Sequence, residues 1–336
     1  MNYRCFAALA AVAVVVLLAP QPAAGQALSP AAKTAAPAKA WTPPRTPDGK
    51  PDLQGIWTDG TVTPLERPKG LGAKEFYTDE EFAKLAARVR EGDVGEEGDI
   101  GAARPQAVRF DLELYGFDIK KSRFASTKRT SLIVGPEGRV PPMLKEATER
   151  NAARAAKNKG HEFDGYENRP LSERCILMNQ ERIPMIPGVN DNNLLQIVQA
   201  PGSVAMLHET NHHTRVIPTD GRPHIPQNIH QWQGDSVGHW EGNTLVVDTT
   251  NFTGLTAFRG SGEKLHLVER FTRADDDTLT YQFTAADPTT WDKPWTAEIP
   301  MRKTPEGIFE YECHEENHSL VNILAGARAE EKRGQK

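Results

Sequence analysis

The sequence lacks the features that place a chain in several common protein classes. Among its 336 residues, 40 are Lys or Arg and 45 are Asp or Glu, so no positive excess exists to neutralise phosphates. It has no glycine-rich phosphate loop between a strand and a helix, no G-x-G-x-x-G and no G-x-S-x-G. We therefore expect no nucleic-acid partner, no nucleotide-dependent redox chemistry and no α/β-hydrolase chemistry.

Long apolar runs are also scarce, and the one at the N-terminus is short. It extends from Phe6 to Ala19, follows Arg4, and is followed by prolines and the small residues Ala23, Ala24 and Gly25. A membrane-spanning helix needs about 20 apolar residues. The pattern predicts a cleaved signal peptide over 1–25, a periplasmic or extracellular protein, and no membrane span after cleavage. An uncleaved N-terminal anchor is the alternative.

Cysteine is rare, with three in the chain. Cys5 would leave with the signal peptide, so Cys175 and Cys313 remain as a pair in an oxidising compartment. We predict that they form a disulfide. A metal site that includes His314, next to Cys313, is the alternative.

The composition divides the exported part into two regions. Residues 26–52 are rich in Ala, Pro and Lys and are expected to form an extended tether. Residues 53–336 are expected to form a single β-barrel-like domain with a helical insertion at about 78–160. Thr78 and Glu81 form a capping box at the start of that insertion. Helices are expected from Asp79, within 142–159 and over 319–331.

In the second half of the chain, apolar and polar residues alternate as they do in β-strands. Its β-branched and aromatic runs are separated by turn signals such as Asp220-Gly221 and Glu241-Gly242-Asn243. Regularly spaced strands of this kind predict a mainly β fold, an antiparallel meander that closes into a lipocalin-like (calycin) barrel with peripheral helices and a C-terminal helix. The expected strands are 53–58, 130–134, 193–199, 204–217, 236–240, 244–250, 265–273, 278–285, 295–302 and 308–313.

Two resemblances accompany this pattern. The Gly55-Ile56-Trp57 segment resembles the first strand of lipocalins and other calycins, in which the Trp closes one end of the barrel; an ordinary core Trp is the alternative. Nearly the whole mature chain resembles a large family of secreted soil-bacterial proteins. That resemblance implies secretion and one continuous domain, and it implies no catalytic residue. It is carried by PRTPDGKPDLQGIW, RTSLIVGPEGRVPPM, ERCI, DGRPH, WEGNTLVVDTTNF, LHLVERFTR, DPTTWDKPW and YECHEENH.

Histidine is concentrated in one part of the sequence. Nine of the 10 His residues lie between His208 and His318, near several carboxylates. Imidazole titrates near neutral pH, so this region is the candidate for acid/base chemistry. His208-Glu209-Thr210-Asn211-His212 matches H-E-x-x-H, but the expected strand over 204–217 would hold its two imidazoles about 13 Å apart, too far for one zinc ion.

The candidate catalytic residues are His208, Glu209, His212, Arg215 and Asp235. In this hypothesis His208 or His212 acts with Glu209 and Asp235 as acid and base, and Arg215 stabilises negative charge. In a strand, Glu209 and Arg215 share one face, which we expect to line the cavity; His208 and His212 share the opposite face, which is the alternative. Substrate-binding residues are expected at strand ends and barrel mouth: His224, Trp232, Trp240, His314 and Glu315.

Three functions remain open from the sequence. The first is a secreted, cofactor-free enzyme, a lyase, isomerase or hydrolase, that acts on a small, partly apolar molecule inside the barrel. The second is a lipocalin-like carrier that binds without chemistry. The third is a periplasmic metal-binding protein in which loop residues such as His224, His230 and His314 converge. No resident metal or other cofactor is expected in the first two.

Overall fold

The computed structural model describes residues 41–61, 63–90, 127–178, 183–187, 194–256, 258–315 and 317–334. The predicted signal peptide, its cleavage site and residues 26–40 of the predicted tether lie outside these ranges. One compact unit begins at Trp41. Residues 41–52, predicted to be part of the tether, instead form an ordered turn in which Arg45 bridges Pro51. The Thr46-Pro-Asp-Gly-Lys sequence favours that turn, and Gly49 adopts a φ of 79° in it.

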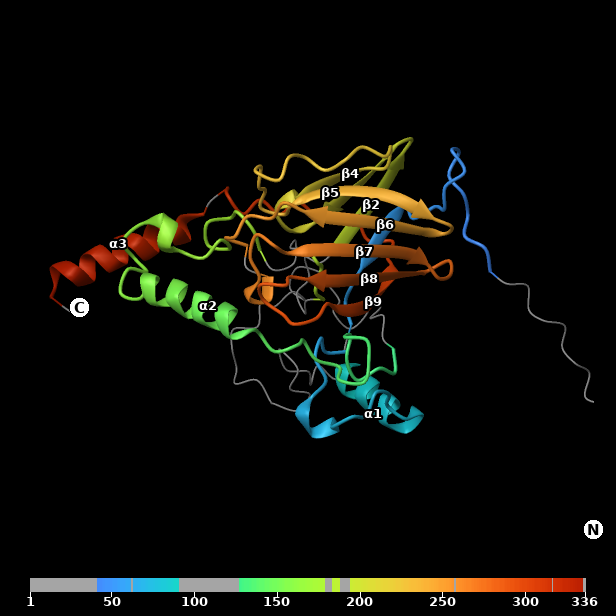
Figure 1. Cartoon of the computed structure of the whole chain (residues 1–336), viewed down its shortest axis with the longest axis horizontal. Coiled ribbons are helices and arrows are strands. Elements are labelled where there is room, and N and C mark those ends of the chain that lie inside the picture. Colours follow the sequence, from blue (N-terminus) through green and yellow to red (C-terminus); the bar gives the residue numbers. More distant parts are fainter. Residues whose placement is uncertain are drawn as a thin grey trace, which may run out of the picture. The chain divides into compact units, whose positions relative to one another are not determined.

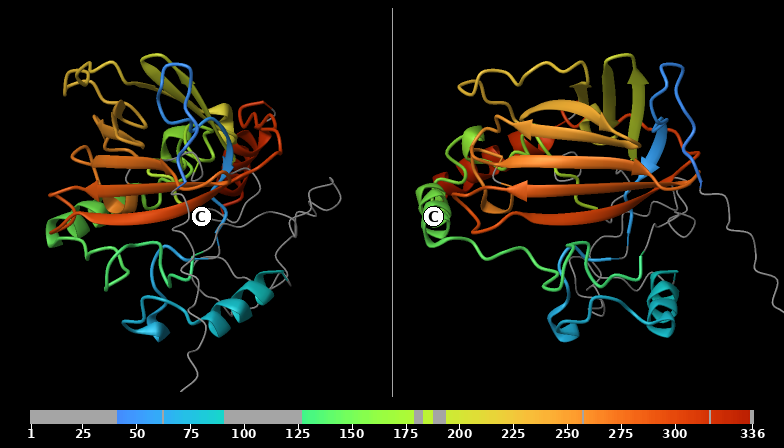
Figure 2. Two further views of the ribbon diagram at one scale, coloured as in Figure 1. Left: turned by 90° about the vertical axis from the view of Figure 1, so that its right-hand side faces the viewer. Right: turned by 45° about the vertical axis from the view of Figure 1, so that its right-hand side comes forward.

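Nine antiparallel strands form one sheet in the order β4-β3-β2-β1-β9-β8-β7-β6-β5, so the predicted mainly β barrel is confirmed. Figure 1 shows the strands, and Figure 2 shows β2–β4 running steeply across β6–β9 as the sheet curves. The bounds are β1 Gly55–Thr58, β2 Leu194–Ala200, β3 Ser203–His208, β4 Thr214–Pro218, β5 Asp235–Glu241, β6 Thr244–Thr250, β7 His266–Arg273, β8 Thr278–Ala286 and β9 Trp295–Lys303.

The barrel is nearly closed by side-chain contact between its two edge strands, β4 and β5. A Cβ atom placed on Gly238 in β5 would lie 2.9 Å from Cγ2 of Ile217 in β4. Real Cβ atoms do not approach that closely, so this position needs glycine for β5 to pack against β4.

The inside of the barrel is filled with aromatic side chains. Phe271, Tyr281, Phe283 and Trp57 are fully buried, and the rings of Phe271 and Tyr281 stack with their centroids 4.9 Å apart. The inward positions of β7, β8 and β9 alternate strictly with outward positions, as the sequence predicted. Within the described residues, the interior is therefore a packed core and not the open chamber that the ligand hypotheses assumed.

Three predicted strands are wrong. Residues 204–217 form the hairpin of β3 and β4, because Asn211 and His212 adopt left-handed conformations with φ of 56° and 49° and reverse the chain. Residues 308–313 form no strand, although they alternate. The predicted strand over 130–134 contributes one isolated bridge, that of Ile133 with Ala297 at the edge of β9.

Three α-helices lie outside the sheet. The capping box of α1 (Asp79–Arg90) is confirmed, since Thr78 Oγ1 accepts the Glu81 N–H at 3.3 Å and Glu81 Oε2 accepts the Thr78 N–H at 2.8 Å. The other helices are α2 (Lys145–Asn158) and α3 (His318–Lys332), and 3-10 turns occupy Lys69–Leu71, Tyr166–Asn168, Thr210–His212 and Phe258–Gly260. In the described part of the chain, no helix has the length and apolar content required to cross a membrane.

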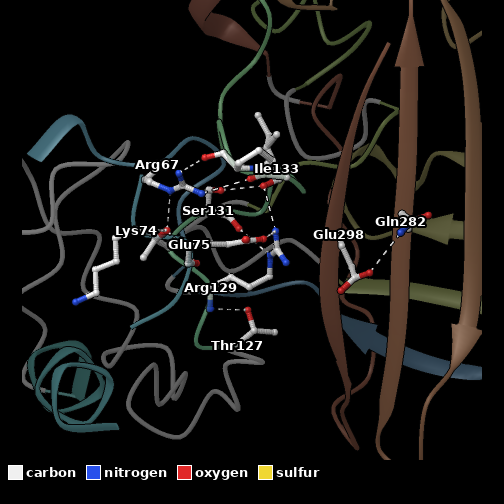
Figure 3. Close-up of polar contacts among 12 residues, drawn as sticks. Arg67, Lys74, Glu75, Thr127, Arg129, Ser131, Ile133, Gln282 and Glu298 are labelled. Carbon is white, nitrogen blue, oxygen red and sulfur yellow. Dashed lines mark hydrogen bonds and ion pairs between the residues drawn. The ribbon is translucent and has the colours of Figure 1, made fainter. Parts of the chain in front are cut away.

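A buried arginine joins the segments around α1. The Arg67 side chain, 1% exposed, donates from Nε to Thr130 Oγ1 at 2.9 Å and from its terminal nitrogens to backbone carbonyls such as that of Pro136 (Figure 3). Gly138 lies against the Arg67 side chain and has a φ of +57°. A Cβ atom there would lie 2.6 Å from Ser131 Oγ and 2.8 Å from Arg67 Nη2, so this position favours glycine. The carbonyl-rich environment explains how this charge is buried.

The predicted disulfide between Cys175 and Cys313 is confirmed, with the two Cα atoms 5.5 Å apart. It fixes the C-terminal loop, residues 304–315, to the segment before β2 across a sequence separation of 138 residues. Closing so long a loop restricts the unfolded chain.

We expect the double variant Cys175→Ala/Cys313→Ala to lose about 2 to 4 kcal/mol of unfolding free energy, measured by urea titration. The wild type treated with reductant serves as the matched comparison, and its midpoint of urea unfolding should shift toward that of the double variant. An unchanged midpoint for the double variant would show that the bond does not stabilise the fold.

Candidate active site

Polar side chains gather inside the barrel where β3 and β4 meet β7 and β8. The register pairs Met206 with Arg215, so the Arg215 side chain points inward beside the β3–β4 turn. The backbone N–H of His208 donates to the carbonyl of His213 at 2.9 Å and closes that turn. We call this group the inner polar cluster; its members are His208, His213, Arg215, Gln233, Glu269 and Tyr281.

One half of the cluster is a buried ion pair. Arg215 Nη1 donates to Glu269 Oε2 at 2.8 Å, and the Glu269 side chain is fully buried. Tyr281 Oη donates to Glu269 Oε1 at 2.9 Å and accepts the Met185 N–H at 3.1 Å. Burial, and next the Glu269 charge, raises the pKa of Tyr281 well above its ordinary value, so the phenol stays protonated. The three side chains together carry no net charge.

The other half consists of two imidazoles, with ring centroids 6.3 Å apart. Burial, and to a smaller extent the Arg215 and His213 charges, lowers the pKa of His208 to about 3. Burial, and next the Arg215 charge, also lowers the pKa of His213. Both rings are therefore mainly neutral at neutral pH.

Several polar atoms of the cluster have no hydrogen-bond partner among the described residues. Gln233 Nε2 lies 2.9 Å from His213 Nδ1, but Gln233 Oε1 and Arg215 Nε are buried and unpaired. The His208 ring, in a residue only 5% exposed, takes part in no hydrogen bond within the described chain. Buried polar groups normally find partners, so a concentration of unpaired ones marks a place for a polar ligand or ordered water.

An apolar recess adjoins the cluster and shares Gln233 with it. The remaining lining includes the Thr256 side chain and six apolar residues, and the space left open holds about one water molecule. Trp232, 37% exposed, stands at the recess and lies in the turn before β5, outside the sheet. The apolar lining residues are Leu177, Ile183, Trp232, Phe252, Phe258 and Leu265.

Two predicted site residues lie elsewhere, on the outside of the sheet. His224 Nδ1 lies 2.7 Å from Asp235 Oδ2, and His224 Nε2 lies 2.9 Å from Asp248 Oδ1. His266 Nε2 binds the other oxygen of Asp248 at 2.7 Å, and this hydrogen bond raises the pKa of His266. The expected grouping of Asp235 with His208 is therefore not found, because Asp235 occupies an outward position of β5 and fastens the β4–β5 loop through His224.

His212 and Glu209 belong to the contacts of the C-terminal loop. His212 Nδ1 lies 2.9 Å from Glu312 Oε1. Glu209 is buried, but its carboxylate accepts the backbone N–H groups of Phe309 at 3.1 Å and Leu194 at 3.4 Å. The turn at Asn211 directs both side chains away from Arg215, so the predicted common face of Glu209 and Arg215 is not formed.

The other predicted substrate-binding residues are dispersed. Trp240 lines a separate small pocket with Asp48, Lys50 and Gln199, while His314 and Glu315 are exposed on the C-terminal loop. Of the five predicted binding residues, Trp232 alone lines the apolar recess. Strands end at both openings of a barrel. Residues at strand ends can therefore lie at opposite openings, which explains why these residues are not close together.

The described residues contain no group of three His, Cys, Asp or Glu side chains placed to hold a metal ion. The H-E-x-x-H residues run from the end of β3 into a 3-10 turn and do not lie on a continuous helical face. Among the described residues, His224, His230 and His314 therefore belong to no such group, and His224 is instead engaged by two aspartates.

The sequence did not identify His213, Gln233, Glu269 and Tyr281 as members of a site. One signal for Glu269 was present: it lies between Leu267 and Phe271 on the apolar face of its strand. A carboxylate at such a position needs a partner from another strand. No local signal identified Gln233.

Protonation of His208 should make the fold sensitive to acid. The unfolded chain takes up a proton at this residue below about pH 6.5, whereas the folded chain takes it up only near pH 3. The contribution of His208 to the free energy of unfolding is therefore fully present above pH 6.5 and is lost as the pH falls toward 3. From pH 7 to pH 5 we expect a loss of about 2 kcal/mol from this residue. Urea titrations at both pH values measure this decrease in unfolding free energy. The decrease should be smaller in His208→Gln than in the wild type, and in the exposed variant His239→Gln it should equal that of the wild type. Equal decreases in all three proteins would show that His208 is not the source of the acid sensitivity.

The comparisons with known proteins name no relative. The chain matches no model of a known protein family, and a search of curated proteins finds no match. The class is accordingly given by the fold and the site: a nearly closed, lipocalin-like barrel with a polar cluster enclosed at one end.

Proposed function

We propose that this protein is an exported, cofactor-free enzyme that performs acid/base chemistry on a small, partly apolar molecule. The observation that carries the proposal is the position of two neutral imidazoles beside Arg215, next to an apolar recess that shares Gln233 with them. Neutral imidazole can accept a proton and return it as imidazolium, a cycle that elimination, isomerisation and hydrolysis can all use.

His213 is the proposed proton-transferring group. Because His213 Nδ1 accepts from Gln233 Nε2, the neutral ring carries its proton on Nε2, where no described residue binds it. That N–H can donate to a reacting oxygen. Arg215 Nε stabilises the negative charge that develops on the oxygen, and the neutral His208 ring accepts a hydrogen bond from the substrate.

Export is part of the proposal. It is supported by the charged start and short apolar run of residues 4–19 and by the disulfide, because such bonds persist in oxidising compartments.

The test is a conversion screen with purified protein. The full exported chain is incubated with a panel of small aromatic and terpenoid alcohols, ketones, amides and esters, and products are followed by mass spectrometry. The proposal predicts that at least one compound is converted by the wild type and not by His213→Gln. Failure to convert any compound that binds would instead support the second candidate, a carrier, which the aromatic lining of the recess also favours.

A further inference from the structure

The unpaired atoms of the inner polar cluster differ in what they offer a ligand. Arg215 Nε can only donate a hydrogen bond, and Gln233 Oε1 can only accept one. His213 donates from Nε2, and the unpaired His208 ring can accept. A ligand that satisfies them needs one head group that both accepts and donates, such as a hydroxyl or a carboxamide, or a carbonyl with a neighbouring N–H or O–H.

The charge balance of the cluster restricts the ligand further. The Arg215 charge is already neutralised by Glu269 at 2.8 Å, and Tyr281 and the two imidazoles are uncharged. A carboxylate ligand would bring an uncompensated negative charge into a buried site, and a cationic ligand would lie against Arg215. Burial of an uncompensated charge is more costly than burial of a hydrogen-bonded neutral group.

Resting on the proposed function, we infer that the substrate is an uncharged molecule with a flat apolar body and one head group that both accepts and donates, such as a hydroxyl or a carboxamide. The head group binds at Arg215, Gln233 and His213. The body occupies the recess against Phe252 and Phe258, with Trp232 moving outward to admit it.

Three probes of nearly the same shape test this inference: benzamide, which is neutral, benzoate, which is an anion, and benzamidinium, which is a cation. Their affinities for the unmodified chain are measured by isothermal titration calorimetry at pH 7. We expect benzamide to bind at least about ten-fold more tightly than either ion. Tighter binding of benzoate or benzamidinium overturns the inference and leaves the proposed function in place.

Two variants locate the binding. Gln233→Leu removes the acceptor and should weaken benzamide binding about ten-fold, whereas Gln282→Leu, on the outer face of β8, should leave it unchanged. Equal affinities in the two variants would place benzamide outside the cluster and overturn the inference. If none of the probes binds and the conversion screen finds no turnover, the proposed function itself fails.

Discussion

Replacement of His213 by Gln should lower kcat for the substrate found in the conversion screen by about 10²- to 10⁴-fold, the usual contribution of a general acid or base. Gln keeps a hydrogen-bonding amide in the cluster but cannot transfer a proton at neutral pH. KM should change little, because the head group retains Arg215 and Gln233 as partners.

The control for this loss is His239→Gln. His239 is exposed on β5 and binds Glu241 at 3.1 Å, outside the inner polar cluster. It should retain wild-type kcat, and the urea midpoint of His213→Gln should show that this variant is folded. A folded His213→Gln enzyme with full kcat would remove His213 from the reaction.

Replacement of Glu269 by Leu should destabilise the fold by about 3 to 5 kcal/mol, because it leaves the Arg215 guanidinium buried without a counter-charge. Tyr281 loses its acceptor in the same variant. The double variant Arg215→Met/Glu269→Leu removes both charges and should recover much of the loss, since apolar residues often replace a buried ion pair at little cost.

Urea titration measures both variants against Glu298→Leu, a carboxylate on the outer face of β9 whose hydrogen bond to Gln282 is 3.4 Å long (Figure 3). That control should lose less than about 1 kcal/mol. If Glu269→Leu were as stable as Glu298→Leu, or if the double variant were less stable than Glu269→Leu, then an unpaired Arg215 charge would not be the cause of destabilisation.

The strands of the second half could be predicted because each has a clear alternation and a turn signal at its end. The β5–β6 hairpin is the best example: Glu241-Gly242-Asn243 marks its turn, and β6 has the predicted bounds, Thr244–Thr250. Residues 308–313 alternate equally well, yet β9 already pairs with β8, β1 and residue 133. Local alternation does not say whether a sheet edge is available, so it predicted a strand where none formed.

The candidate site was harder to predict because it depends on a reversal of the chain and on distant pairs. The turn after His208 contains no Gly or Pro, and its two left-handed residues, Asn211 and His212, are of types that adopt this conformation more often than most but do not by themselves predict a turn. Because of that turn, His208 and Arg215 both point inward, whereas an uninterrupted strand would place them on opposite faces. The partner of Arg215 is 54 residues away in sequence.

We expect His208 and His213 to be neutral inside the barrel and to present free nitrogens to a ligand. Long-range ¹H–¹⁵N NMR of histidine side chains at pH 6.5, with and without benzamide, measures both properties. We predict neutral-ring nitrogen shifts for both residues, and a change at His213 Nε2 when benzamide is added while His239 stays constant. Protonated rings at these two positions, or no change at His213 once benzamide binding is saturated, would contradict the account.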